Sequence, residues 1–159
     1  MAMYLRELTI KFGTARAGDG NRVQLPVGEV VASPRDVATL LYPLLAHEPV
    51  EVFSVLCLSV KHRVVGYAPI SRGTLDATVV HPRDVFRAAI LGNAGALALV
   101  HNHPSGNPSP SPDDDLLTVR LVACGDLMGM EVVDHVIVAE HGYFSYREAG
   151  RLECLSRRP

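Results

Sequence analysis

Two histidines and a run of three aspartates are the residues whose types and spacing most clearly suggest chemistry. His101 and His103 end an apolar segment, and residues two apart point to the same side if that segment is an extended strand. Two imidazoles on one side can share a metal ion, and a third, anionic ligand would leave one position of a zinc ion open for water. Asp113, Asp114 and Asp115 follow a proline-rich loop that is able to fold back toward the histidines. The pattern therefore predicts an open metal site of the catalytic kind.

These residues belong to a longer pattern that resembles a known family. H-x-H followed after ten residues by an aspartate resembles the motif of JAMM (MPN-type) metallohydrolases, and it makes His101, His103 and Asp114 the expected metal ligands. The segment HNHPSGNPSPS, with SPRDV and LDATVVHPRDVF before it and VVDHVIV after it, resembles the RadC-like branch of that family. The resemblance covers roughly residues 31–150. It implies one zinc ion per chain and a JAMM/MPN fold, which is similar to that of cytidine deaminases.

The same resemblance implies roles for a glutamate and a serine. In JAMM enzymes a glutamate on an upstream strand is the general acid and base, and Glu51, in PVEVFSVLCL, stands where that pattern places it. A carboxylate beside a zinc-bound water can take its proton and return it to the leaving amine. Glu48 is the competing candidate, but it lies in an expected turn, where a solvated carboxylate needs no explanation. Ser111, three residues before Asp114, would donate a hydrogen bond to the oxyanion.

Ser111 and Asp114 also have an interpretation that involves no metal. Ser111, Pro112 and the two aspartates after them spell a helix start, with a serine N-cap and an acidic third residue that completes a capping box. The matching distance from the two histidines favours metal binding by Asp114, and the two roles are compatible.

The other histidines carry weaker expectations. His135, inside VVDHVIV, is either a partner that orients a metal ligand or a structural histidine with its hydrogen bonds satisfied. His81, just before Pro82, is expected to be an N-cap or surface residue. No role is assigned to three histidines in expected turns, His47, His62 and His141. Turn chemistry alone accounts for Ser105, Gly106 and Asn107, although these residues could shape the loop beside a substrate.

Periodicity and turn residues predict a mixed central sheet flanked by helices, an α/β fold of the α+β type. The expected helices span residues 34–46, 82–91 and 113–128. The expected strands span residues 4–12, 50–60, 63–70, 96–101, 131–139 (alternating) and 141–146 at the sheet edge, with a loop and short strand over 73–80. Residues 1–30 are expected to belong to the same domain as the catalytic unit at 31–150, followed by a tail at 151–159.

Composition narrows the class of protein. The chain of 159 residues is 48% hydrophobic and 20% charged, which is typical of a folded globular domain. A net charge of −2 gives nucleic acid no support as a partner, although a local basic patch could exist. We expect a cytoplasmic protein with no membrane span, because no apolar run is long enough and the first residues lack a signal peptide pattern. Cys57, Cys124 and Cys154 form no C-x-x-C pair, and Cys57 and Cys124 are expected to be buried small hydrophobic residues.

The leading hypothesis is a zinc-dependent hydrolase that cleaves a peptide or isopeptide bond in a polypeptide whose identity the sequence does not specify. The alternative is a RadC-like accessory protein in DNA repair or recombination without protease activity. The helix-hairpin-helix segment that usually precedes the RadC catalytic domain is expected to be missing, which weakens the inference about DNA. A scaffold without catalysis is the third alternative, and the joint presence of Glu51, Ser111 and the three ligand candidates argues against it. The sequence does not indicate an oligomeric state.

Overall fold

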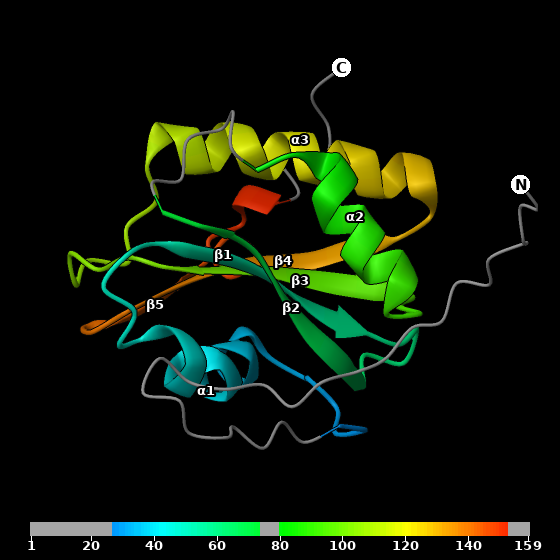
Figure 1. Ribbon diagram of the computed structural model, residues 1–159, viewed down its shortest axis with the longest axis horizontal. Helices are drawn as coiled ribbons and strands as arrows, with labels where there is room; N and C mark the ends of the chain where they lie inside the picture. Colours follow the sequence, from blue (N-terminus) through cyan, green and yellow to red (C-terminus); the bar gives the residue numbers. More distant parts are fainter. Residues whose placement is uncertain (1–26, 74–79, 153–159) are drawn as a thin grey trace, which may run out of the picture.

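A five-stranded sheet lies at the centre of the part of the chain that the structure describes (Figure 1). The structure is a computed structural model that describes residues 27–73 and 80–152. Its strands are β1 (Val52–Leu58), β2 (Val64–Arg72), β3 (Ala96–Asn102), β4 (Glu131–Ala139) and β5 (Gly142–Ser145). Its helices are α1 (Pro34–Leu45), α2 (Pro82–Leu91) and α3 (Pro112–Met128).

The sheet is mixed, with the strand order β2-β1-β3-β4-β5. Strand β1 pairs antiparallel with both β2 and β3, and β4 pairs antiparallel with β5 at the edge. Strands β3 and β4 are parallel, so the chain must cross over between them, and α3 makes that connection. The predicted α+β fold with a mixed sheet and flanking helices is confirmed.

The helices lie on both sides of the sheet. Figure 1 shows α1 against one face and α2 and α3 against the other. Each face has its own apolar cluster, one built around Leu41 and Leu45 of α1 and the other around Phe86 of α2 and Leu121 of α3. Every residue of β1 and β3 is buried, because these central strands are covered on both faces.

The predicted elements match the structure closely. Helix α1 begins at the predicted Pro34, with Ser33 as its N-cap, α2 has the predicted bounds, and α3 begins one residue earlier than predicted, at Pro112. The chain turns at Lys61 and His62 between β1 and β2, as the sequence indicates. The strand expected over residues 4–12 and nearly all of the segment expected over 73–80 lie outside the described residues.

The interior of the protein includes polar residues of β4. Every β4 residue after Glu131 is buried, because helices cover both sides of the sheet. Asp134 and His135 are therefore both inside the protein. Cys57 is buried as predicted, and burial raises the pKa of its thiol to about 11. The prediction that Cys124 is buried is wrong, because this residue is only half-buried where it packs against the cluster of α2 and α3.

Candidate metal centre

His101, His103 and Asp114 meet at the carboxyl end of β3. His101 lies within β3 and is fully buried, His103 follows the strand, and Asp114 is the third residue of α3. Their ligand atoms all lie within 4.8 Å of one another. His101 Nε2 is 3.0 Å from His103 Nε2 and 3.2 Å from Asp114 Oδ1. The structure thus brings together the three residues that the sequence predicts as metal ligands.

Backbone pairing and the proline-rich loop hold His103 in place. Strand β3 ends at Asn102, but the His103 N–H still donates to the Val138 carbonyl of β4 at 2.9 Å. His103 Nδ1 lies 2.9 Å from the Asn107 carbonyl, which is only an acceptor, so Nδ1 must carry the proton. In the neutral ring the lone pair is then on Nε2, the atom that faces the other two ligand candidates.

The N-terminus of α3 holds Asp114. Ser111 is the N-cap of α3, and its Oγ accepts a hydrogen bond from the Asp114 N–H at 3.2 Å. In return, Asp114 Oδ2 accepts hydrogen bonds from the Ser111 N–H and Ser111 Oγ, both at 2.7 Å. Both parts of the predicted capping box are present. Asp114 Oδ1 lies 3.2 Å from His101 Nε2, so the same carboxylate caps the helix and belongs to the cluster.

The protonation of the cluster follows from its burial and contacts. Burial lowers the pKa of His101, although the contact with the Asp114 carboxylate opposes this shift. His103 is partly exposed, and its contact with the Asp114 carboxylate raises its pKa. Burial raises the pKa of Asp114, but the contacts with both imidazoles outweigh this effect, so the pKa of this carboxyl lies well below the usual range. Asp114 is therefore the anionic member of the cluster.

This donor set fits a divalent metal ion. Two neutral imidazole nitrogens and one carboxylate oxygen can converge on one point, and such a set leaves a fourth position for water. The His103 side chain is 12% exposed, compared with 0% for His101 and 5% for Asp114, so the cluster is most accessible from the side of His103. The residues present can therefore hold a metal ion.

Glu51 lies next to this cluster, immediately before β1. Phe53 of β1 pairs with His101 of β3 in the antiparallel register, and Glu51 comes two residues before Phe53. The charge of Glu51 opposes the burial that lowers the pKa of His101, and it contributes to raising the pKa of His103. The predicted general base is thus near the predicted ligands.

Glu48, the competing glutamate, is not the solvated turn residue that the sequence suggests. Its side chain is 8% exposed and forms an ion pair with Arg72 of β2. The chain buries this carboxylate because Arg72, at the end of the neighbouring β2 strand, supplies a charged partner. Asn102 Nδ2 also donates to the Val50 carbonyl at 3.1 Å, and these contacts join the α1–β1 turn to β2 and β3. The contacts of Glu48 are structural.

His135 and Thr118 are two further residues at the site, and no motif in the sequence marks Thr118. His135 Nε2 lies 2.8 Å from His101 Nδ1, and His135 Nδ1 lies 2.6 Å from Thr118 Oγ1. Burial lowers the pKa of His135 well below its usual value. Thr118 comes four residues after Asp114, and this helical spacing was the available signal that the two share a face.

The histidines to which the sequence assigns no metal-binding role are not part of the cluster. His81 is the exposed N-cap of α2, as predicted, and its side chain makes no capping hydrogen bond. His141 lies beside Gly106, where an added Cβ would sit 3.5 Å from the imidazole ring. Gly106 has a φ of 83°, so this loop position favours glycine.

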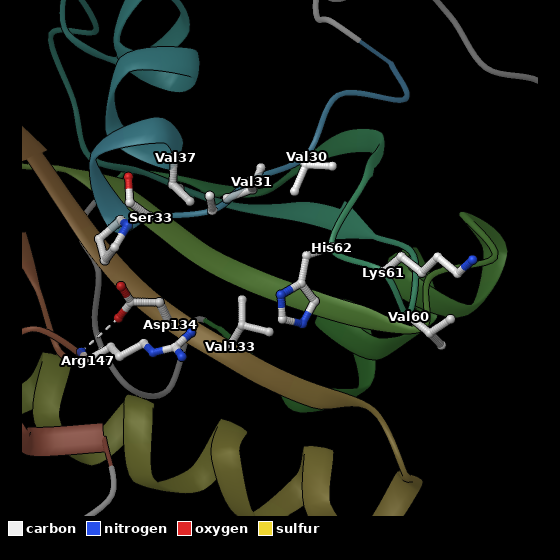
Figure 2. A pocket seen from close by; sticks show the side chains of 12 residues that line it. Val30, Val31, Ser33, Val37, Val60, Lys61, His62, Val133, Asp134 and Arg147 are labelled. Carbon is white, nitrogen blue, oxygen red and sulfur yellow. Dashed lines mark hydrogen bonds between the residues drawn. The ribbon is translucent and has the colours of Figure 1, made fainter.

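A separate pocket of about 520 Å³ lies on the face of the sheet that α1 covers (Figure 2). Figure 2 shows Asp134 at this pocket with a hydrogen bond from Arg147, whose backbone N–H lies 2.9 Å from Oδ1. The His135 N–H and the Ser145 hydroxyl also donate to Asp134. The carboxylate is thus occupied by protein donors, and the pocket is not part of the metal centre. The residues that line it are Val30, Val31, Ala32, Ser33, Pro34, Val37, Val60, Lys61, His62, Val133, Asp134 and Arg147.

Comparison with known proteins agrees with the observed fold. The model of the RadC-like JAB domain matches residues 31–151, so the chain belongs to the RadC-like JAB domain family. A UPF0758 protein of Methanosarcina barkeri is 42% identical over 120 residues, which are 76% of this chain and 52% of that protein. A UPF0758 protein of Symbiobacterium thermophilum is 47% identical over 122 residues, and one of Thermotoga maritima is 51% identical over 102 residues. These two matches cover 77% and 64% of this chain, respectively.

The chain spans about half the length of these curated relatives, with 52%, 52% and 46% of their residues matched. Their name states no activity. Among the residues that the structure describes, no helix is long and apolar enough to cross a membrane.

Proposed function

We propose that this chain is a zinc-dependent hydrolase that cleaves an amide bond, peptide or isopeptide, in a polypeptide. The observation that carries the proposal is the convergence of His101, His103 and Asp114 within 4.8 Å, in a family of JAB domains. Imidazole nitrogens suit zinc, whereas magnesium and calcium prefer an all-oxygen set. When bound, zinc would lower the pKa of a water toward about 7 and polarise the carbonyl of the scissile bond.

The protein side of the reaction is a proton transfer and a hydrogen bond. Glu51, which immediately precedes β1, takes a proton from the attacking water and gives it to the leaving amine. Ser111 donates its hydroxyl to the carbonyl oxygen as that oxygen gains negative charge. In the structure this hydroxyl donates to Asp114 Oδ2, so it must rotate away to reach a substrate.

The proposal is tested by incubating the protein with peptide and isopeptide libraries, with zinc present, and detecting new amino termini by mass spectrometry. Cleavage is expected from the wild-type chain and not from a Glu51→Gln control prepared in parallel. Equal cleavage by both proteins, or none by either when zinc is bound, would overturn the proposed activity.

A role in DNA repair or recombination without protease activity is the alternative. The net charge of −2 offers no general attraction for phosphates, and no contact in the described residues indicates a nucleic acid site. The hydrolase is therefore the function that we propose.

A further inference from the structure

We propose that Thr118 and His135 form a hydrogen-bonded relay that fixes the tautomer of His101, so that His101 Nε2 presents a lone pair to the metal. The proposal rests on the metal site described above and assigns positioning roles to Thr118 and His135. Both side chains are fully buried, and neither belongs to the three ligand candidates.

The relay starts from a group whose hydrogen-bonding role is fixed. Thr118 Oγ1 lies 2.6 Å from the Asp114 carbonyl oxygen, which can only accept, so the hydroxyl proton of Thr118 points to that oxygen. Thr118 Oγ1 also lies 2.6 Å from His135 Nδ1. With its proton already committed, Oγ1 must accept there, and His135 Nδ1 must carry a proton. The opposite arrangement would bring two lone pairs together at 2.6 Å on the Asp114 side.

The next step transfers this constraint to the metal ligand. In a neutral imidazole one nitrogen donates and the other accepts, so a proton on His135 Nδ1 leaves a lone pair on His135 Nε2. This atom lies 2.8 Å from His101 Nδ1, which must therefore be the donor. The lone pair of His101 is then on Nε2, the atom that faces His103 and Asp114.

Aromatic packing keeps the two rings of the relay aligned. The ring of Tyr146 stacks on His135 with centroids 5.1 Å apart and planes 7° apart, and Phe53 stacks on His101 at 6.0 Å and 19°. The Tyr146 hydroxyl donates to Asp115 Oδ1 at 2.7 Å, which ties this ring to α3. The rings cannot rotate freely, so the pattern of donors and acceptors is maintained.

The relay matters because the other tautomer of His101 has a strong partner. With its proton on Nε2, His101 would donate to the Asp114 carboxylate, whose Oδ1 is 3.2 Å away. That hydrogen bond would prevent both His101 and Asp114 from binding the metal. The relay opposes it, because a proton on Nε2 would leave His101 Nδ1 and His135 Nε2 as two acceptors facing each other at 2.8 Å.

Two variants of Thr118 separate the hydroxyl from the packing. Thr118→Val keeps the shape of the side chain and removes the hydroxyl, whereas Thr118→Ser keeps the hydroxyl and removes a methyl group. Zinc affinity, measured by competition with a chromogenic chelator, is expected to fall about 10- to 100-fold in Thr118→Val and to stay near wild type in Thr118→Ser. Wild-type affinity in a folded Thr118→Val protein would overturn the relay, and so would a larger loss in Thr118→Ser than in Thr118→Val.

The tautomers themselves can be observed in the metal-free wild-type protein. Long-range ¹H–¹⁵N NMR spectra of chelator-treated, ¹⁵N-labelled protein are expected to show protonated Nδ1 and unprotonated Nε2 in both His101 and His135. A proton on His101 Nε2 would overturn the relay without reference to metal or activity. If the wild type shows the expected tautomers but binds no zinc in the competition assay, the proposed function fails while the relay stands.

Discussion

At the residue scale, two glutamates three positions apart have different environments. The charge of Glu51 acts on His101 and His103, whereas Glu48 is buried in an ion pair with Arg72. We therefore predict that Glu51→Gln keeps its zinc but loses roughly 100-fold or more in single-turnover rate, because only the proton acceptor is removed.

Glu48→Gln is the matched control, since it makes the same chemical change outside the cluster. Its melting temperature is expected to fall, because the buried partner of Arg72 loses its charge, while turnover per folded molecule stays near wild type. Full activity of Glu51→Gln together with loss of activity in Glu48→Gln would reverse the assignment of the general base.

Ser111 allows a similar separation of structure from chemistry, because Ser33 begins α1 with the same capping box that Ser111 forms at α3. Ser111→Ala and Ser33→Ala are each expected to lower the free energy of unfolding by about 1 kcal/mol in a denaturant titration. Only Ser111→Ala is expected to lose turnover as well, by roughly 100-fold, if the hydroxyl donates to the carbonyl oxygen. Equal turnover in the two variants would leave Ser111 as a cap alone.

The sequence was sufficient to find the ligand candidates but not the groups behind them. The H-x-H spacing and the aspartate after the loop identify His101, His103 and Asp114, because these residues are close in the chain or part of one motif. No sequence motif identifies Thr118, because its contact with His135 forms only when β4 packs against α3. The burial of Glu48 could not be predicted from the sequence either, because its partner Arg72 is 24 residues away on another strand.

At the element scale, the position of α3 on the sheet depends on a glycine. An added Cβ at Gly125 would lie 2.5 Å from the Met130 carbonyl oxygen and 3.1 Å from Val132 Cγ2. We predict that Gly125→Ala lowers the free energy of unfolding by about 1–3 kcal/mol, because α3 would have to shift away from the strand that holds His135.

Leu127→Ala, in the same helix and 88% exposed, is the control and is expected to change stability by no more than about 0.5 kcal/mol. Alanine is intrinsically about 1 kcal/mol better than glycine inside a helix, so a Gly125→Ala protein more stable than wild type would show that the close approach is absent. Chemical denaturation measures both values.

The elements themselves could be predicted because their signals are local. Ser33-Pro34 and Ser111-Pro112 mark two helix starts, and the apolar run after Val50 marks a buried central strand. The strand order could not be obtained in this way. The placement of β3 between β1 and β4 depends on pairing between distant segments, and the burial of both faces of β4 follows from that order.

At the scale of the whole molecule, charge argues against tight binding of nucleic acid. The chain has 15 lysine and arginine residues against 17 aspartate and glutamate residues. We predict weak binding to duplex DNA at physiological salt with little sequence preference, measured by fluorescence anisotropy of a labelled duplex. Nanomolar affinity at that salt would favour the DNA-repair alternative over the hydrolase.

The proposed metal centre is most directly tested by the zinc content of the protein purified without added metal, measured by inductively coupled plasma mass spectrometry. One zinc per chain is expected for the wild type, and clearly less for His101→Ala and Asp114→Asn, since each change removes or weakens one bond to the ion. A wild-type zinc content near zero that does not rise when zinc is added would contradict the proposed metal centre.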